Sequence, residues 1–190
     1  MEKIKTSLIV FLIFCICNVC VFAQSDKTDK YNEALEYLKE NNIIYINEDF
    51  DINNTVSRAE GACVMARAIG NTYEYTDVVP VFDDVGKNHW AVAYIDQLYK
   101  YGIVNGVGNE LFCPDDYLTY EQFIKMAVCF MGLEAEAYQL GGYSDGFLAV
   151  AQEYGILENI KCSEKQIVNS GDVALILYRV VLYKENEKFF

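Results

Sequence analysis

The stretch that decides the fold reads HWAVAYIDQLYKYGIVNG, from residue 89 to residue 106. Its large apolar side chains Trp90, Tyr94 and Leu98 recur every four residues, which is the spacing of one face of an α-helix. Gly102 then provides the residue type that best tolerates the left-handed backbone found directly after a helix. We therefore predict a first helix over residues 89–101.

A second helix is predicted after a loop rich in turn residues, which covers residues 105–116. Thr119 is followed three residues later by Gln122, the pattern of a capping box that satisfies the free backbone N–H groups of a first helical turn. Apolar residues at helical spacing then continue across residues 123–130 and stop at Gly132. The pattern indicates a helix–loop–helix unit.

The same unit occurs three times along the chain. Ser57 and Glu60 repeat the capping box in the first copy, and Asn169 and Asp172 occupy the same positions in the third. A single copy has too little surface to bury its own apolar face, so we expect the three to pack as one body. The predicted boundaries are residues 24–75 for the first repeat, 76–137 for the second and 138–190 for the third.

Residues 1–23 have the features of a secretory signal peptide. Lys3 and Lys5 precede an apolar run over residues 8–22, which ends at the small residue Ala23. The alternative is an uncleaved membrane anchor, but the run is shorter than the roughly 20 residues that a spanning helix needs. We predict an exported chain with no membrane span once this segment is removed.

Charge and cysteine content narrow the function classes. The net charge of −13 argues against nucleic acid as a partner, because an acidic surface repels phosphate. A zinc site is not expected, since the cysteines after residue 23 are widely spaced and His89 is the only histidine. Buried thiols are favoured, with one or two disulfides as the alternative. These cysteines are Cys63, Cys113, Cys129 and Cys162.

With these residues laid out, the chain resembles the S-layer homology (SLH) domain family. The second repeat carries the motif most fully, with FDDV at 82–85, WA at 90–91, GIVNG at 102–106 and FCPD at 112–115. The first repeat adds SRAE at 57–60. The resemblance is moderate in the first repeat and faint in the third.

The resemblance implies an all-α fold in which three helix–loop–helix repeats form a pseudo-threefold assembly. The first helix of each repeat would join a central three-helix bundle, and the second helices would project as prongs. It further implies a non-catalytic anchoring module, without a cofactor, that binds secondary cell-wall polysaccharide, commonly pyruvylated, in grooves between the prongs. The expected location is the cell wall or cell surface, in association with an S-layer.

The resemblance also selects a candidate glycan-binding set. Arg58 occupies the family's arginine position, and Asp84 and Trp90 occupy its opening aspartate and tryptophan positions. An arginine can fork onto a carboxylate, and aromatic faces suit the apolar faces of sugar rings. Glu60 and Tyr120 complete the expected set, although Tyr120 stands where a second arginine would be.

Each of these residues also has a purely structural interpretation. Arg58 could be a solvated residue at a helix start. Trp90 lies on an apolar helix face, where core packing is at least as strong an interpretation as sugar stacking, and different ring edges could serve both. Asp84 is expected to brace or cap the loop before the first helix. Ser170 replaces the third arginine. A degenerate module that serves as a structural or protein-interaction unit, without glycan binding, is therefore the alternative function.

Metal binding and catalysis have weaker support. Residues 49–60 fit the spacing of an EF-hand calcium loop, but an apolar segment at 43–46 stands where the preceding helix should run into the first ligand. His89 has no serine or cysteine partner at a recognisable spacing. We therefore predict neither metal ligands nor catalytic residues.

Overall fold

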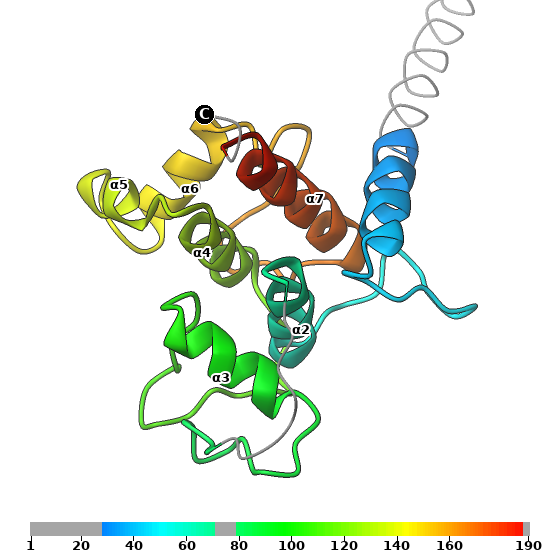
Figure 1. The fold of residues 1–190 in the computed structure, drawn as a ribbon. Helices are drawn as coiled ribbons and strands as arrows, with labels where there is room; N and C mark the ends of the chain where they lie inside the picture. Colours follow the sequence, from blue (N-terminus) through cyan, green and yellow to red (C-terminus); the bar gives the residue numbers. More distant parts are fainter. Residues whose placement is uncertain (1–27, 71–78, 188–190) are drawn as a thin grey trace, which may run out of the picture.

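The computed structural model describes residues 28–70 and 79–187, which are helical and contain no strand. A helix over residues 28–40 comes first. The others are α2 (Arg58–Ala68), α3 (Val92–Lys100), α4 (Tyr120–Met131), α5 (Glu134–Gln139), α6 (Asp145–Glu153) and α7 (Ser170–Glu187) (Figure 1). The all-α prediction is confirmed. The predicted signal peptide lies outside the described residues.

The predicted capping positions begin the second helix of every repeat. Ser57 and Glu60 form the complete capping box at α2, in which the Ser57 backbone N–H donates to Glu60 Oε2 at 2.7 Å. At α4 the Thr119 N–H donates to Gln122 Oε1 at 3.2 Å. At α7 the Asp172 N–H donates to the Asn169 side chain. Short-range hydrogen bonds therefore set these helix starts, as the sequence predicts.

The loops before these three helices are joined in a closed cycle. The first backbone N–H of each helix donates to a loop carbonyl of another repeat. The pairs are Arg58 to Asp116 at 2.9 Å, Tyr120 to Gln166 at 3.0 Å and Ser170 to Asn54 at 2.9 Å. This cycle gives the three helix starts equivalent surroundings, while threefold symmetry of the whole assembly stays a prediction.

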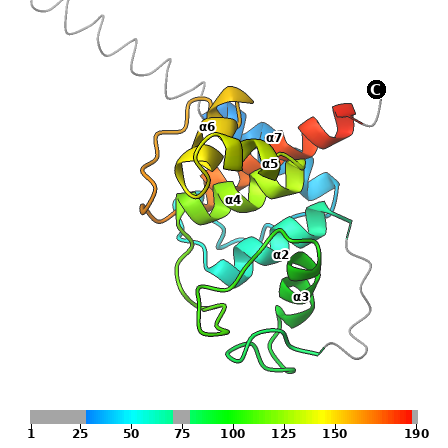
Figure 2. The same cartoon turned by 90° about the vertical axis from the view of Figure 1, so that its left-hand side faces the viewer.

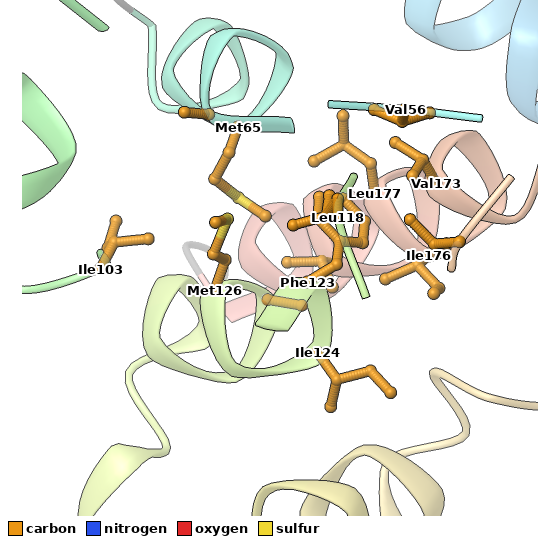
Figure 3. Close-up of a cluster of buried hydrophobic side chains, with 14 of the residues drawn as sticks. Val56, Met65, Ile103, Leu118, Phe123, Ile124, Met126, Val173, Ile176 and Leu177 are labelled. Carbon is orange, nitrogen blue, oxygen red and sulfur yellow. The ribbon is translucent and has the colours of Figure 1, made fainter. Parts of the chain in front are cut away.

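The core lies between α2, α4 and α7, which contact one another. Figure 3 shows Met65 of α2, Phe123 of α4 and Leu177 of α7 converging there, and all three are buried. In α7, consecutive residues from Gly171 to Leu177 are buried. A helix that is apolar on most of its circumference needs protein contacts all round, so α7 occupies the interior.

The resemblance assigned the centre of the fold to the wrong helices. It implied a bundle of first helices, but the described helices at the centre are the second ones. The first helix α3 packs on α2, and α6 packs on α4 and α5. Both views place α2 between α3 and α7 (Figure 1, Figure 2). The physical reason is that α7 is apolar and buried over a run of consecutive residues, so it needs neighbours on all sides, which α2 and α4 provide.

Candidate functional site

Two cavities flank α2. The Trp90 cavity, of about 600 Å³, lies between residues 44–56, α2, Trp90 and the start of α7. The Arg58 cavity, of about 340 Å³, lies between Arg58, residues 103–107, α4, Tyr138 and the start of α6. Both volumes are in the range of small-molecule sites.

The repeat relates the two cavities. Counted from the capping boxes, the α2 residues in one correspond to the α4 residues in the other. The pairs are Glu60 with Gln122, Cys63 with Lys125 and Val64 with Met126. Each cavity therefore uses the same face of a second helix, but with different chemical groups.

Arg58 is held tightly against the second repeat. Its side chain is 4% exposed, and Nε donates to the Phe112 carbonyl oxygen at 2.8 Å. The guanidinium carbon lies 4.6 Å from the centroid of the Phe112 ring. Burial lowers the pKa of Arg58, and the nearby Cys113, Tyr143 and Asp116 oppose this change. Arg58 is thus a packed cation at one side of its cavity, not a solvated residue.

Other polar and aromatic side chains complete the Arg58 cavity. Lys125 of α4 donates to the Ile103 carbonyl oxygen at 3.1 Å. Tyr138 and Tyr143 line the cavity and are exposed. Although Tyr143 is more than half exposed, partial burial of the residue, together with the adjacent Glu121 charge, raises its pKa to about 12, so its hydroxyl remains a hydrogen-bond donor. The cavity offers two cations beside two aromatic rings.

Asp84 lies behind this cavity instead of lining it. Its carboxylate accepts hydrogen bonds from the backbone N–H groups of Phe112 at 2.8 Å and Cys113 at 2.6 Å. Cys113 has a φ of 56°, a left-handed backbone that these bonds help to hold. Asp84 therefore braces the loop before the second helix, not the loop before the first. It positions Phe112, which in turn holds Arg58.

Trp90 and Glu60 lie together in the Trp90 cavity, apart from Arg58. Trp90 is 49% exposed and precedes α3, so the core-packing interpretation is wrong for this side chain. Its ring stacks near His89, with 5.8 Å between centroids. The structure thus divides the predicted site between two cavities.

Tyr120 belongs to the core. It is 1% exposed, and its hydroxyl donates to the Asp172 carboxylate, which also accepts from the Tyr31 hydroxyl. The buried Asp172 carboxylate satisfies the phenol hydroxyl, so this side chain can be fully buried without a lost hydrogen bond. The candidate role of Tyr120 at a groove surface is therefore corrected to a structural one.

Sequence reasoning did not select Arg67 or Tyr45, which both line the Trp90 cavity. A signal for Arg67 was present, because it follows Glu60 by seven residues and Cys63 by four and so shares their helix face. Lys125 could have been found from the matching face of α4. No local pattern marks Tyr45, which lies in a loop.

The segment 49–60, which has the spacing of a calcium loop, uses its polar groups in hydrogen bonds within the segment. Asp51 Oδ1 accepts from the backbone and side chain of Asn53, and Glu60 accepts from Ser57. Within residues 28–70 and 79–187 no three metal-ligating side chains gather into a site. The same part of the chain has no helix long and apolar enough to cross a bilayer.

The four cysteines within the described residues carry free thiols. Cys63 is buried, as expected, while Cys113, Cys129 and Cys162 are only partly buried. Burial raises the pKa of Cys129 to about 11, so this thiol remains protonated near neutral pH.

Arg58→Ala is expected to lower the free energy of unfolding by about 2 kcal/mol, because the Phe112 carbonyl loses its donor and a small void forms. Urea denaturation measures this loss. Lys39→Ala, at an exposed site, is the control and should change stability by less than about 0.5 kcal/mol. An unchanged midpoint for Arg58→Ala would show that Arg58 is not held as described.

Residues 81–124, which include Asp84, Trp90 and the loop that holds Arg58, match the S-layer homology domain family. This part of the chain is an S-layer homology domain, and the resemblance seen in its motifs is confirmed.

Three relatives extend the similarity beyond that segment. A cell surface protein of Thermoanaerobacter kivui is 32% identical over 70% of this chain and 17% of its own length. A middle cell wall protein of Brevibacillus brevis is 25% identical over 82% of this chain and 14% of its own. A surface layer protein of Brevibacillus choshinensis is 26% identical over 73% and 12%. The chain thus spans less than a fifth of each relative.

Proposed function

We propose that this chain is a non-catalytic module that anchors at the cell surface by binding cell-wall polysaccharide. The observation that carries the proposal is the Arg58 cavity, where Arg58 and Lys125 lie beside the rings of Tyr138 and Tyr143. A guanidinium and an ammonium suit acidic groups of a glycan, and tyrosine faces suit the apolar faces of sugar rings. The relatives' names are in keeping with a cell-surface location.

The composition of the cavity favours binding over hydrolysis. Glycosidases require two carboxyl groups on either side of the scissile bond. The described residues that line the Arg58 cavity include neither a carboxylate nor a histidine. The side chains that line the cavity would therefore offer cations and aromatic rings to an acidic saccharide, and they include no pair of carboxylates for hydrolysis.

A structural module without glycan binding is the second candidate function. It is favoured by two positions where the family has arginine and this chain has Tyr120 and Ser170. Tyr120 is buried on Asp172, and the Ser170 hydroxyl donates to the Asp51 carbonyl oxygen at 2.6 Å. Both side chains serve the fold, so at most one cavity keeps the arginine at a helix start.

A binding assay with purified cell-wall sacculi tests the proposal. The double variant Lys125→Gln with Tyr143→Ala should weaken saturable binding at least about tenfold, because it removes one cation and one exposed ring. The double variant keeps Arg58, whose contacts stabilise the fold. A thermal melt verifies that the variant is folded. The matched control changes Lys165 to Gln and Tyr117 to Ala, both exposed outside the cavity, and should bind like the natural chain.

The outcomes separate the candidate functions. Absence of saturable binding by the natural chain would favour the structural module. Equal binding by the double variant and its control would remove the Arg58 cavity from the binding site. Release of soluble fragments from the sacculi would contradict the non-catalytic assignment.

A further inference from the structure

His89 is the single histidine of the chain, and Trp90, the residue after it, is the single tryptophan. The two rings lie stacked, with 5.8 Å between their centroids and 27° between their planes. Trp90 lines the Trp90 cavity, while His89 is partly buried just before α3. The imidazole is thus the direct neighbour of an indole that forms one wall of the cavity.

The imidazole also accepts a hydrogen bond at the start of α3. The backbone N–H of Ala91, the residue that precedes the helix, donates to His89 Nδ1 at 3.1 Å. Ala91 is 0% exposed, so water does not replace this acceptor. A ring nitrogen accepts a hydrogen bond only in the neutral imidazole, because both nitrogens carry protons in the cation. The bond therefore requires unprotonated His89.

A positive charge on the ring would lie at an unfavourable place. The dipole of a helix opposes a cation at its start, and the first turn of α3 contains no acidic residue that would offset this effect. Tyr94 is the titratable residue of that turn. Protonation of His89 would thus cost both the Ala91 bond and a repulsion from the helix start.

The other titratable groups on the surrounding elements do not replace the lost bond. The loop before α3 contributes Asp83, Asp84 and Lys87. The walls that share the cavity with Trp90 contribute Tyr45, Asp49, Glu60, Cys63 and Arg67. Asp84 and Glu60 already accept from backbone N–H groups. Within residues 28–70 and 79–187, no carboxylate forms an ion pair with His89.

We propose that His89 is a pH-sensitive positioning residue for Trp90. The neutral imidazole accepts from the Ala91 N–H and keeps the indole in the wall of the cavity. When a proton binds Nδ1, the bond to Ala91 is lost, the imidazolium turns away from the helix start and the indole loses its stacking partner. Histidine exchanges its proton between about pH 5 and 8, so we expect the change in this interval. The inference goes beyond the proposed function and does not depend on what the Arg58 cavity binds.

Fluorescence of the full chain tests the proposal, because its one tryptophan is the residue that should move. From about pH 8 to about pH 5, the emission of the natural chain should shift to longer wavelength as the indole becomes more solvated. Proton NMR of the one imidazole should give the same midpoint. In His89→Asn, an amide oxygen can accept from the N–H two residues on but does not titrate, so the emission should not shift.

The folding equilibrium supplies a second measurement. Loss of a side-chain acceptor at a helix start changes a folding equilibrium constant about fivefold. On acidification over the same interval, the natural chain should therefore lose about fivefold more in this constant than His89→Asn does, as measured by urea denaturation. The two proteins share every carboxylate, so the titration of those groups cancels. Lys87→Gln, at an exposed site on the same loop, is the control and should keep the emission shift.

His89→Ala lacks the acceptor at every pH and should emit at the longer wavelength throughout. Thermal melting verifies that each variant is folded. An absent shift in the natural chain, or one that persists in His89→Asn, would overturn the proposal. A midpoint that differs from that of the imidazole would assign the change to another group and reject the role of His89. A fall in intensity at constant wavelength would show that the imidazolium stays stacked on the indole, which also contradicts the proposal.

Discussion

Gly146→Ala is expected to lower the free energy of unfolding by about 3 kcal/mol, because the fold leaves no room for the added methyl group. An ideal Cβ at Gly146 would lie 1.9 Å from the Ala137 carbonyl oxygen and 2.9 Å from its carbon. Because both atoms are backbone, no side-chain rotation relieves the clash, and α5 and α6 must move apart. Urea denaturation followed by circular dichroism measures the loss.

Gly86→Ala is the matched control. No heavy atom lies within 4 Å of an added Cβ at Gly86. Its stability should therefore stay within about 0.5 kcal/mol of that of the natural chain. Equal denaturation midpoints for Gly146→Ala and Gly86→Ala would contradict the close packing of α5 against α6.

Asp172→Ala is expected to cost about 3 kcal/mol, because it leaves two buried phenol groups without an acceptor. Asp172 is 3% exposed and accepts from the hydroxyls of Tyr31 and Tyr120, and from Asn169 Nδ2 at 3.0 Å. Burial and then the Asp172 carboxylate raise the pKa of both phenols, so both remain protonated donors. The three groups come from the three predicted repeats, so the loss should weaken the whole body.

A double-mutant cycle isolates this network. Tyr120→Phe removes one hydrogen-bond donor. The double variant Tyr120→Phe with Asp172→Ala should lose about 1 kcal/mol less unfolding free energy than the sum of the two single variants. The reason is that the double variant has no unpaired Tyr120 hydroxyl. Thermal or urea unfolding of the four proteins supplies the values. Strict additivity would mean that Tyr120 and Asp172 contribute independently, against the hydrogen bond described.

The residues that the sequence did not place correctly have a common feature. Trp90 was predicted on an apolar helix face and instead precedes α3 and is half exposed, while Tyr120 was expected at a groove and is buried. Tyr120 lies at a helix start that its capping box correctly predicted, whereas α3 begins at Val92, three residues after its predicted start. Helical spacing tells which residues share a face, but it does not tell which of two faces meets another repeat.

The central position of α2, α4 and α7 was not predictable for a similar reason. The apolar periodicity of α3 and of α4 is comparable in the sequence, so neither helix is marked as interior by its own pattern. What distinguishes the second helices is the cycle of loop hydrogen bonds at their starts, such as Arg58 N–H to Asp116 and Ser170 N–H to Asn54. This cycle joins different repeats and places their helix starts close together.

The sequence by itself determined the capped helix starts and the acidic, all-α character of the chain, and it predicts three repeated units. These features depend on residues at most four positions apart, such as Ser57 with Glu60, and on composition. Only the tertiary structure decided which side chains line a cavity. Arg58 is held by Phe112, 54 residues away, and Tyr120 by Asp172, 52 residues away. Such contacts depend on how the repeats pack, and no local pattern encodes them.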